Sequence, residues 1–210
     1  DQPVMRAVLA DLALEVEGAT AAVMRLCRSF DLAATDPKEA RRARILTPAI
    51  KYWICKSAPG FVYEAMECLG GNGYVEDYAL ARLYREAPVN AIWEGSGNVM
   101  ALDLVRAMSN ADDAKALVGE LLDEVRDFPG RAERKAAMDT LLAEAELETR
   151  AREFAETIAL LAAAAALQQT APQIAEMFLQ AGYNGERRRL CGSGRPHEVS
   201  SRLLERASPD

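Results

Sequence analysis

Residues 5–30 of the chain read MRAVLADLALEVEGATAAVMRLCRSF, and the spacing of the apolar side chains in this stretch decides the fold class. Apolar residues recur at alternating steps of four and three, which places them on one face of a helix. The members of this stripe are Met5, Leu9, Leu12, Val16, Ala19, Val23, Leu26 and Phe30. A helix of about seven turns with one continuous apolar face is typical of a helical bundle.

The composition supports the same fold class. The chain has 210 residues, and half of them are apolar, which is enough for one large domain or for a domain with an appendage. Alanine, leucine, glutamate and arginine dominate, whereas aromatic residues make up 6% of the chain. These preferences favour helix over strand. We therefore predict an all-α protein, an up-and-down helical bundle.

The rest of the chain reads as further helices separated by breaks. Asp36-Pro37 is predicted to cap the second helix, and Ser109-Asn110-Ala111-Asp112 reads as a turn and an N-cap. The charged segment 38–44 is expected to be solvated, and Thr47-Pro48 and Pro59-Gly60 are expected to kink or interrupt the second helix. Residues 70–97 are rich in glycine and predict at most a short helix over 78–84. Later helices are predicted to end near Met108, and to cover 112–127, 131–143, an alanine-rich stretch up to Pro172, a segment after Pro172, and 199–206.

Charge and cysteine usage exclude several classes of function. Four scattered cysteines and one histidine, His197, form neither a zinc pattern nor a disulfide framework, so we expect no metal and a reducing cytoplasm. The sequence contains no signal peptide and no stretch suited to a bilayer, which favours a soluble protein that is a fragment of a longer one. The net charge of −7 gives no broad attraction for nucleic acid.

Two glycine-bearing segments are the candidate sites. Residues 67–86 read ECLGGNGYVEDYALARLYRE, and residues 92–98 read IWEGSGN. Glycines permit positive φ and expose backbone N–H groups, so Gly70, Gly71 and Gly73 can lie close to a flat or phosphorylated ligand. The run from Gly95 to Asn98 precedes a predicted helix, whose N-terminus favours an anion. The alternative is that both segments are helix caps that bind no ligand.

These two motifs, in this order and separation, resemble the C-terminal signature of the acyl-CoA dehydrogenases, including Asp77, Arg82 and Glu86. The resemblance covers about residues 1–108 and leaves 109–210 as a helical extension. It implies a flavoprotein with FAD as cofactor, and it implies that the Gly70 turn touches the FAD of a neighbouring subunit. The cofactor-binding residues it implies are Gln2, Glu67, Gly70, Gly71, Gly95, Ser96, Gly97 and Asn98.

The resemblance gives Glu94 the role of catalytic base. Dehydrogenation of an acyl-CoA thioester removes an α-proton while a hydride leaves the β-carbon, so a carboxylate must lie beside the α-carbon in a water-poor cleft. The backbone N–H of Glu94 would also polarise the thioester carbonyl. The alternative is a solvated carboxylate or a salt bridge to Arg82 or Arg85. Trp93 and Tyr84 are expected either to line the pocket or to belong to the core.

Other features resemble the DNA-alkylation-response branch of the family: Glu67, the Trp-Glu-Gly-Ser-Gly-Asn loop, Lys51-Tyr52-Trp53 before Pro59, and the extension. That branch implies DNA binding through a basic face, but residues 111–210 hold 13 Lys or Arg against 18 Asp or Glu. DNA is therefore disfavoured, and Arg187-Arg188-Arg189 is expected to be a solvated tail.

The partners implied by the resemblance are acyl-CoA, an electron-transfer flavoprotein, and further copies of the chain in a dimer or tetramer. Two alternatives stay open: an alkylation-response flavoprotein with little dehydrogenase activity, and a helical oligomerisation module. The family's other domains hold most of the flavin and acyl-CoA. We therefore expect this chain alone to be colourless and inactive.

Overall fold

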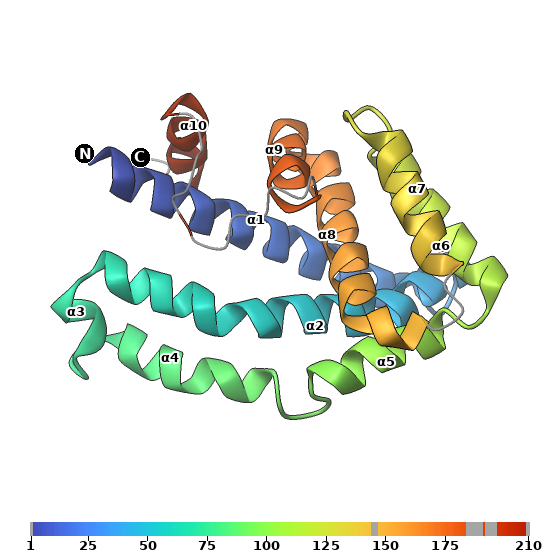
Figure 1. The fold of residues 1–210 in the computed structure, drawn as a ribbon, viewed down its shortest axis with the longest axis horizontal. Helices are drawn as coiled ribbons and strands as arrows, with labels where there is room; N and C mark the ends of the chain where they lie inside the picture. The colour runs from blue at the N-terminus through green and yellow to red at the C-terminus, as the bar shows by residue number, and fades with distance from the viewer. Residues whose placement is uncertain (1, 144–146, 184–190, 192–196, 209–210) are drawn as a thin grey trace.

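A computed structural model describes residues 2–143, 147–183, 191 and 197–208, and these residues form ten α-helices and one 3-10 helix without a β-strand (Figure 1). The predicted all-α fold is confirmed. The elements are α1 (Pro3–Leu32), α2 (Pro37–Cys68), α3 (Gly71–Tyr74), α4 (Ala79–Asn90), α5 (Gly97–Ala107), α6 (Ala111–Glu124), α7 (Arg131–Leu142), η1 (Leu147–Arg150), α8 (Ala151–Thr170), α9 (Pro172–Tyr183) and α10 (His197–Ala207).

The two longest helices, α1 and α2, run antiparallel and pack against each other (Figure 1). The turn between them ends at Asp36, whose side chain accepts a hydrogen bond from the backbone N–H of Lys38 at 2.8 Å. Pro37 follows in the first turn of the helix, where a backbone N–H makes no intrahelical hydrogen bond, so the absence of an N–H in proline costs nothing. The cap predicted at Asp36-Pro37 is therefore present.

Helix α2 continues through both of its prolines, so the predicted interruption at Pro59-Gly60 is wrong, and the helix does not restart at Thr47-Pro48. An interior proline removes one backbone hydrogen bond and costs about 3 kcal/mol. Tertiary packing outweighs that cost here, because α2 packs against α1, α4, α5 and α8 along its length. Pro48 itself is buried, and the hydroxyl of Thr47 donates to the carbonyl of Ala43 at 2.7 Å in the same turn.

The segment after the Gly70 turn contains more helix than predicted. Helix α4 covers Ala79–Asn90 instead of stopping near residue 84, and Pro88 lies inside its last turn. Ala81 and Ala87 are buried, and α4 packs against α2. The small residues of α4 face α2, whereas its arginine and glutamate side chains face solvent. The high glycine content of residues 70–97 therefore led to an underestimate of the helix length.

The apolar stripe of α1 faces the rest of the chain only in part. Met5, Leu9, Val16, Val23 and Phe30 are exposed, between 38% and 57% of each residue, whereas Leu12 is buried and Ala19 and Leu26 pack against the core. Further buried residues follow at four-residue steps: Ala10, Leu14, Gly18 and Ala22. A Cβ on Gly18 would lie 2.2 Å from Cε2 of Phe178, so glycine lets α9 approach α1 closely.

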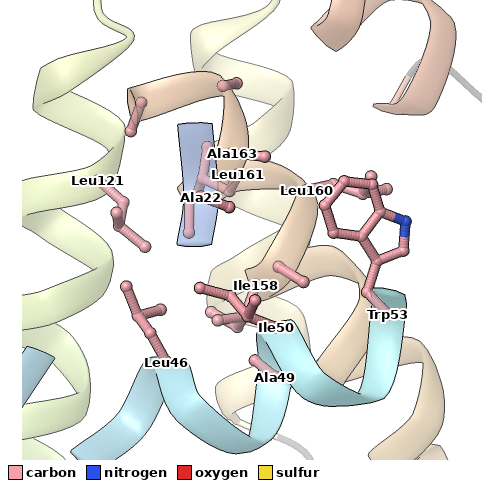
Figure 2. Close-up of a cluster of buried hydrophobic side chains, with 14 of the residues drawn as sticks. Ala22, Leu46, Ala49, Ile50, Trp53, Leu121, Ile158, Leu160, Leu161 and Ala163 are labelled. Atoms are coloured by element: carbon pink, nitrogen blue, oxygen red, sulfur yellow. The ribbon is translucent and has the colours of Figure 1, made fainter. Parts of the chain in front are cut away.

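Helix α8 lies at the centre of the core. Its alanine-rich middle is buried, and it packs against α1, α2, α5, α6 and α9. Figure 2 shows Ile158 and Leu161 of α8 among Ala22 of α1, Leu46 and Ile50 of α2, and Leu121 of α6. The rings of Trp53 and Phe178 meet edge to face, with centroids 5.8 Å apart. One hydrophobic cluster therefore joins helices on both sides of residue 108.

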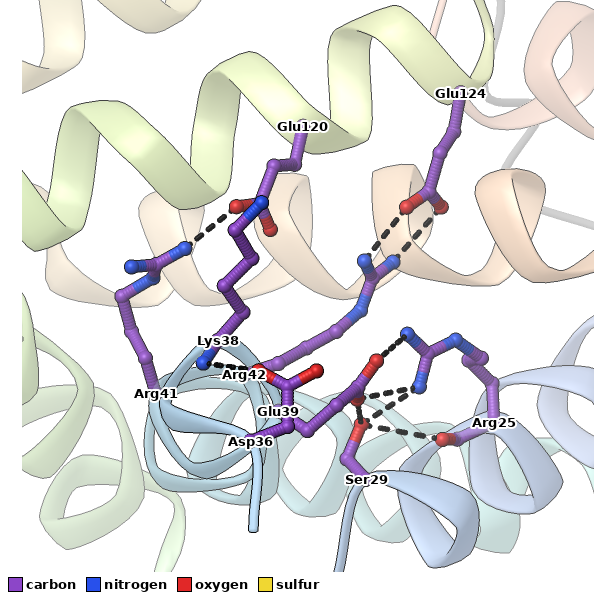
Figure 3. A network of polar contacts seen from close by, with 9 residues as sticks. All are labelled: Arg25, Ser29, Asp36, Lys38, Glu39, Arg41, Arg42, Glu120 and Glu124. Atoms are coloured by element: carbon purple, nitrogen blue, oxygen red, sulfur yellow. Dashed lines mark hydrogen bonds and ion pairs between the residues drawn. The ribbon is translucent and has the colours of Figure 1, made fainter. Parts of the chain in front are cut away.

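The charged segment 38–44 is not simply solvated, which corrects the prediction for it. Arg42 is 3% exposed and donates two hydrogen bonds to Glu124 of α6, at 2.6 and 2.8 Å. Arg41 of α2 pairs with Glu120 of α6 at 2.5 Å (Figure 3). Glu39 accepts hydrogen bonds from Arg25 and Ser29 of α1. These ion pairs join α2 to α1 on one side and to α6 on the other.

The predicted last helix is present as α10, which packs against α1. Arg206 pairs with Glu17 at 2.7 Å, and Arg6 donates to the hydroxyl of Ser201 at 2.9 Å. Arg187-Arg188-Arg189 and the side chain of His197 lie outside the described residues. Within the described helices, no segment is both long and apolar enough to cross a membrane.

Candidate cofactor and catalytic loops

Glu94 lies in the loop between α4 and α5, in an unusual backbone conformation. Its φ is 53°, and it is the non-glycine residue with a positive φ in the described chain. Gly95 follows with a φ of 118°. Non-glycine residues rarely adopt this region, and the cost of about 1–3 kcal/mol persists where surrounding contacts impose it. The side chain of Glu94 is exposed.

Lys51 supplies the contact that holds this conformation. Its Nζ donates to the carbonyl of Trp93 at 2.7 Å and to the carbonyl of Gly95 at 3.1 Å. One ammonium group on α2 therefore forms hydrogen bonds with the backbone on both sides of Glu94. Because its two acceptors are 42 and 44 residues away along the chain, sequence spacing could not reveal this role.

The N-terminus of α5 follows directly. Ser96 is the N-cap residue, but its hydroxyl makes no capping hydrogen bond, so it stays available to a ligand. Gly97 lies against α2, since a Cβ there would lie 3.2 Å from Cδ of Lys56 and 3.6 Å from Cε2 of Tyr52. The Oδ1 atom of Asn98 accepts a hydrogen bond from Nε of Arg152 in α8 at 2.8 Å.

The second glycine turn lies at the end of α2. Gly70 has a φ of 58° and a ψ of −136°, which an L side chain rarely adopts, and nothing lies within 4 Å of a Cβ built there. Gly73 is required for packing, because its Cβ would lie 2.1 Å from the carbonyl oxygen of Met66. Gly71 is exposed with open space around it. Glu67 accepts from the hydroxyl of Tyr63 at 3.2 Å, and this hydrogen bond raises the pKa of Tyr63.

The structure groups the predicted residues into two sets. Glu94, Gly95, Ser96, Gly97 and Asn98 form one loop, whereas Glu67, Gly70 and Gly71 lie at the other end of α4, about 18 Å away for a helix of this length. Gln2 precedes α1 at the end of the helix pair where α2 terminates (Figure 1). The two turns therefore do not surround one compact ligand within a single chain. The contact of the Gly70 turn with a neighbouring subunit's FAD stays a prediction.

The salt-bridge alternative for Glu94 is not what the structure shows. Arg82 pairs with Glu86 at 3.7 Å, and Arg85 pairs with Glu76. The pair with Arg85 lowers the pKa of Glu76 through its hydrogen bond. Trp93 and Tyr84 are 59% and 39% exposed, so neither is a core residue within this chain. The ring of Tyr84 packs against that of Tyr63, with centroids 6.0 Å apart, whereas the exposed ring of Trp93 can contact a partner segment or a ligand.

A hollow of about 360 Å³ lies elsewhere, between α7, α8 and α9, and is lined by Thr140, Arg150, Glu156 and Gly182 among others. None of the predicted site residues lines it. Arg150, at its rim, is paired with Glu153 at 2.6 Å. The candidate site is thus an exposed loop, held from behind by α2 and α8, and not an enclosed pocket of this chain.

Comparison with known families identifies the protein family of this chain. The profile of the acyl-CoA dehydrogenase C-terminal domain matches residues 1–109, more than half of the chain, and this span includes both glycine turns. The chain belongs to the acyl-CoA dehydrogenase family. The match ends just after α5, so the helices from α6 onward lie outside the matched span, and the division of the chain at residue 108 stays a prediction.

Curated relatives of this acyl-CoA dehydrogenase domain are much longer proteins. Putative acyl-CoA dehydrogenase AidB of Escherichia coli K12 is 53% identical over 125 residues, which cover 60% of this chain and 23% of AidB. Acyl-CoA dehydrogenase family member 11 of Caenorhabditis elegans is 32% identical over 126 residues, 59% of this chain and 20% of that protein. The AidB match confirms the predicted resemblance to the alkylation-response branch.

Solved structures extend the likeness in fold beyond α5. Bd2924 in its apo form superposes with a TM-score of 0.73 at 28% identity, covering 80% of this chain and 34% of that one. Caenorhabditis elegans ACDH-11 in complex with C11-CoA gives a TM-score of 0.67 at 24% identity, covering 95% of this chain and 38% of that one. At this identity, the likeness to ACDH-11 shows a shared fold alone, and the shared fold includes most of residues 109–210.

Proposed function

We propose that this chain is the C-terminal part of a FAD-dependent acyl-CoA dehydrogenase that removes hydrogen from Cα and Cβ of acyl-CoA thioesters. One observation carries the proposal: Glu94, within the span that matches the family, is held at a positive φ between two carbonyls bound to Lys51. The loop thus presents an exposed carboxylate from a rigid backbone. That arrangement suits a base that must meet a substrate carbon at a fixed position.

The loop residues are chemically suited to a flavin nucleotide. Ser96 has a hydroxyl that caps nothing, Gly95 and Gly97 add no side chains, and the first N–H groups of α5 point out of its N-terminus. Ser96, Gly97 and Asn98 would hold the cofactor. The flavin, when bound, supplies the acceptor for the β-hydride.

Glu94 would take the α-proton on its carboxylate. Loss of this proton places negative charge on the thioester oxygen, and a backbone N–H aimed at that oxygen would stabilise it. The N–H of Glu94 suits this role, because it donates to no backbone carbonyl of the described residues. The exposed carboxylate would be covered by the substrate and by protein segments outside this chain, and loss of water makes a carboxylate a stronger base.

The proposal includes partners. An electron-transfer flavoprotein would reoxidise the flavin, and copies of the chain would associate as a dimer or tetramer. The exposed apolar stripe of α1, which consists of Met5, Leu9, Val16, Val23 and Phe30, supports association, because steps of four and seven residues place these side chains on one face that can pack against another helix. The same stripe supports the second candidate function, a helical oligomerisation module without chemistry.

Anaerobic titration of the full-length protein with a panel of acyl-CoAs tests the proposal. Bleaching of the flavin absorbance by at least one acyl-CoA is the expected result. A flavoprotein that no acyl-CoA bleaches, and that binds duplex DNA in a salt-dependent manner, would instead fit the alkylation-response alternative. A protein that binds neither flavin nor DNA but associates would be the oligomerisation module.

A further inference from the structure

Arg152 connects the helical extension to the loop that carries Glu94. It lies in the first turn of α8, and its Nε lies 2.8 Å from Oδ1 of Asn98, the second residue of α5. The two residues are 54 positions apart, and Arg152 lies outside the span that matches the family's C-terminal domain. The extension therefore supplies a side chain directly to the candidate cofactor loop.

The hydrogen bond fixes which way the Asn98 amide faces. An arginine side chain has donors but no acceptor, so it can only meet the carbonyl oxygen of the amide. The NH2 group of Asn98 must then point away from Arg152. No hydrogen bond from this NH2 group to another described residue is present, which leaves two donors beside the N-terminus of α5.

Both sides of this contact are set by the core. Phe154 and Ala155 are buried one turn after Arg152, and Ala101 and Leu104 are buried after Asn98. Helices α5 and α8 pack against each other, so packing fixes the backbone positions from which the two exposed side chains meet. The neighbouring acidic residue, Glu153, is paired with Arg150 and does not compete for Arg152.

We propose that Arg152 is a positioning residue for the cofactor site: it orients the Asn98 amide so that its NH2 group donates to an oxygen acceptor of the bound flavin nucleotide. This inference rests on the proposed function, and it assigns the extension a role in the site. Arg152 touches no reacting atom. Its positive charge near the helix N-terminus adds to the attraction for a phosphate group.

The test measures FAD binding to full-length protein from which the flavin has been removed. Arg152→Met keeps much of the side-chain length but removes all donors, and we expect it to weaken FAD binding about tenfold, as for loss of one well-placed hydrogen bond. Arg152→Lys, which restores a donor, should recover most of the affinity. Arg206→Met is the matched control, since it breaks an equivalent extension-to-bundle contact, with Glu17 at 2.7 Å, far from the loop.

Asn98→Asp examines the contact from the other side. The carboxylate would pair with Arg152 and keep the melting temperature of the apo-protein at or above that of wild type, but it has no donor and would repel phosphate. We expect FAD binding to weaken by about tenfold or more in this variant. If the contact were merely structural, Arg152→Met would lower the melting temperature, and neither Arg152→Met nor Asn98→Asp would change the affinity for FAD.

The outcomes separate the two proposals. If wild type binds FAD and Arg152→Met binds it equally well, or if Arg206→Met loses as much affinity, the role of Arg152 is refuted while the proposed function stands. If wild-type protein fails to bind FAD, the proposed function fails and the inference falls with it. Weakened binding in Arg152→Met and Asn98→Asp, with recovery in Arg152→Lys, supports both.

Discussion

Lys51 Nζ lies 2.7 Å from the carbonyl oxygen of Trp93, so a side chain in the middle of α2 holds the residue that precedes Glu94. The same ammonium reaches the carbonyl of Gly95 at 3.1 Å. Two hydrogen bonds from one charged group to the carbonyls of the residues on either side of a strained residue restrict the loop strongly. The position of the carboxylate thus depends on a helix that is itself fixed in the core.

Lys51→Met should loosen this loop without unfolding the protein. We expect the turnover rate of the full-length enzyme to fall about tenfold or more, because misplacement of a base by a small distance is costly. The melting temperature should change little, since Lys51 is only partly buried. Lys56→Met is the control on the same helix: its stem packs near Gly97, but it binds neither loop carbonyl. Equal activity loss in both variants would argue against the clamp.

The ion pair between Arg42 and Glu124 predicts a large stability effect. Glu124→Ala leaves a buried arginine without its partner, which costs about 3–5 kcal/mol in the free energy of unfolding. The matched control is Asp103→Ala, which removes an equally bidentate partner from Arg44 on the same helix. Arg44 is half exposed, so that loss should be about 1 kcal/mol or less. Chemical denaturation measures both, and equal losses would contradict the role given to burial.

The sequence predicted what depends on local pattern. The Asp36-Pro37 cap, the turn at Asn110 and the start of α9 at Pro172 all follow from residues adjacent in the chain, and all are present. The break predicted at Pro59-Gly60 is absent because the packing that keeps α2 continuous comes from helices distant in sequence. The apolar stripe of α1, which is exposed at five of its eight residues, shows the same limit, since periodicity does not tell which part of a face meets which partner.

The candidate site divides in the same way. Glu94 and the residues from Gly95 to Asn98 are contiguous, so their motif identified them together. Lys51 and Arg152 reach this loop from 42 and 54 residues away, and only the fold brings them there. The Gly70 turn was grouped with the loop by motif, but α4 keeps the two apart.

Glu39 makes stability depend on pH in the acid range. The hydrogen bond from Arg25 lowers the pKa of Glu39 from 4.5 to about 2. A carboxylate with a depressed pKa stabilises the fold above its unfolded pKa, and this contribution is lost as pH falls from about 4.5 to about 2. Glu39→Gln should therefore be less stable at pH 7 by about 1–2 kcal/mol, below the full value of the shift because the pair is partly solvated.

Melting temperatures of wild type and Glu39→Gln, measured from pH 7 to pH 2, check this. The gap between the two proteins should narrow as pH falls below about 4.5, because wild type loses the contribution that the variant lacks throughout. A gap that stays constant across this range would show that the pKa of Glu39 is not lowered in the folded protein.

Gly18 is predicted to tolerate no side chain. A Cβ at this position meets the ring of Phe178 at 2.2 Å, so Gly18→Ala should destabilise the protein by about 1–3 kcal/mol through overpacking. Gly119→Ala is the matched control in α6, where nothing lies within 4 Å of the added Cβ, and it should stabilise by about 0.5–1 kcal/mol. Recovery of Gly18→Ala by Phe178→Leu would confirm the clash as the cause, whereas a neutral Gly18→Ala would refute it.

The rate of flavin reduction by acyl-CoA in an anaerobic single turnover of the full-length protein tests the central assignment most directly. Glu94→Gln should slow this step at least about 100-fold while acyl-CoA still binds, because an amide cannot take the α-proton. Glu86→Gln, which alters an exposed glutamate paired with Arg82, is the control and should reduce its flavin at the wild-type rate. A Glu94→Gln protein that reduces its flavin as fast as wild type would contradict the assignment of Glu94 as the base.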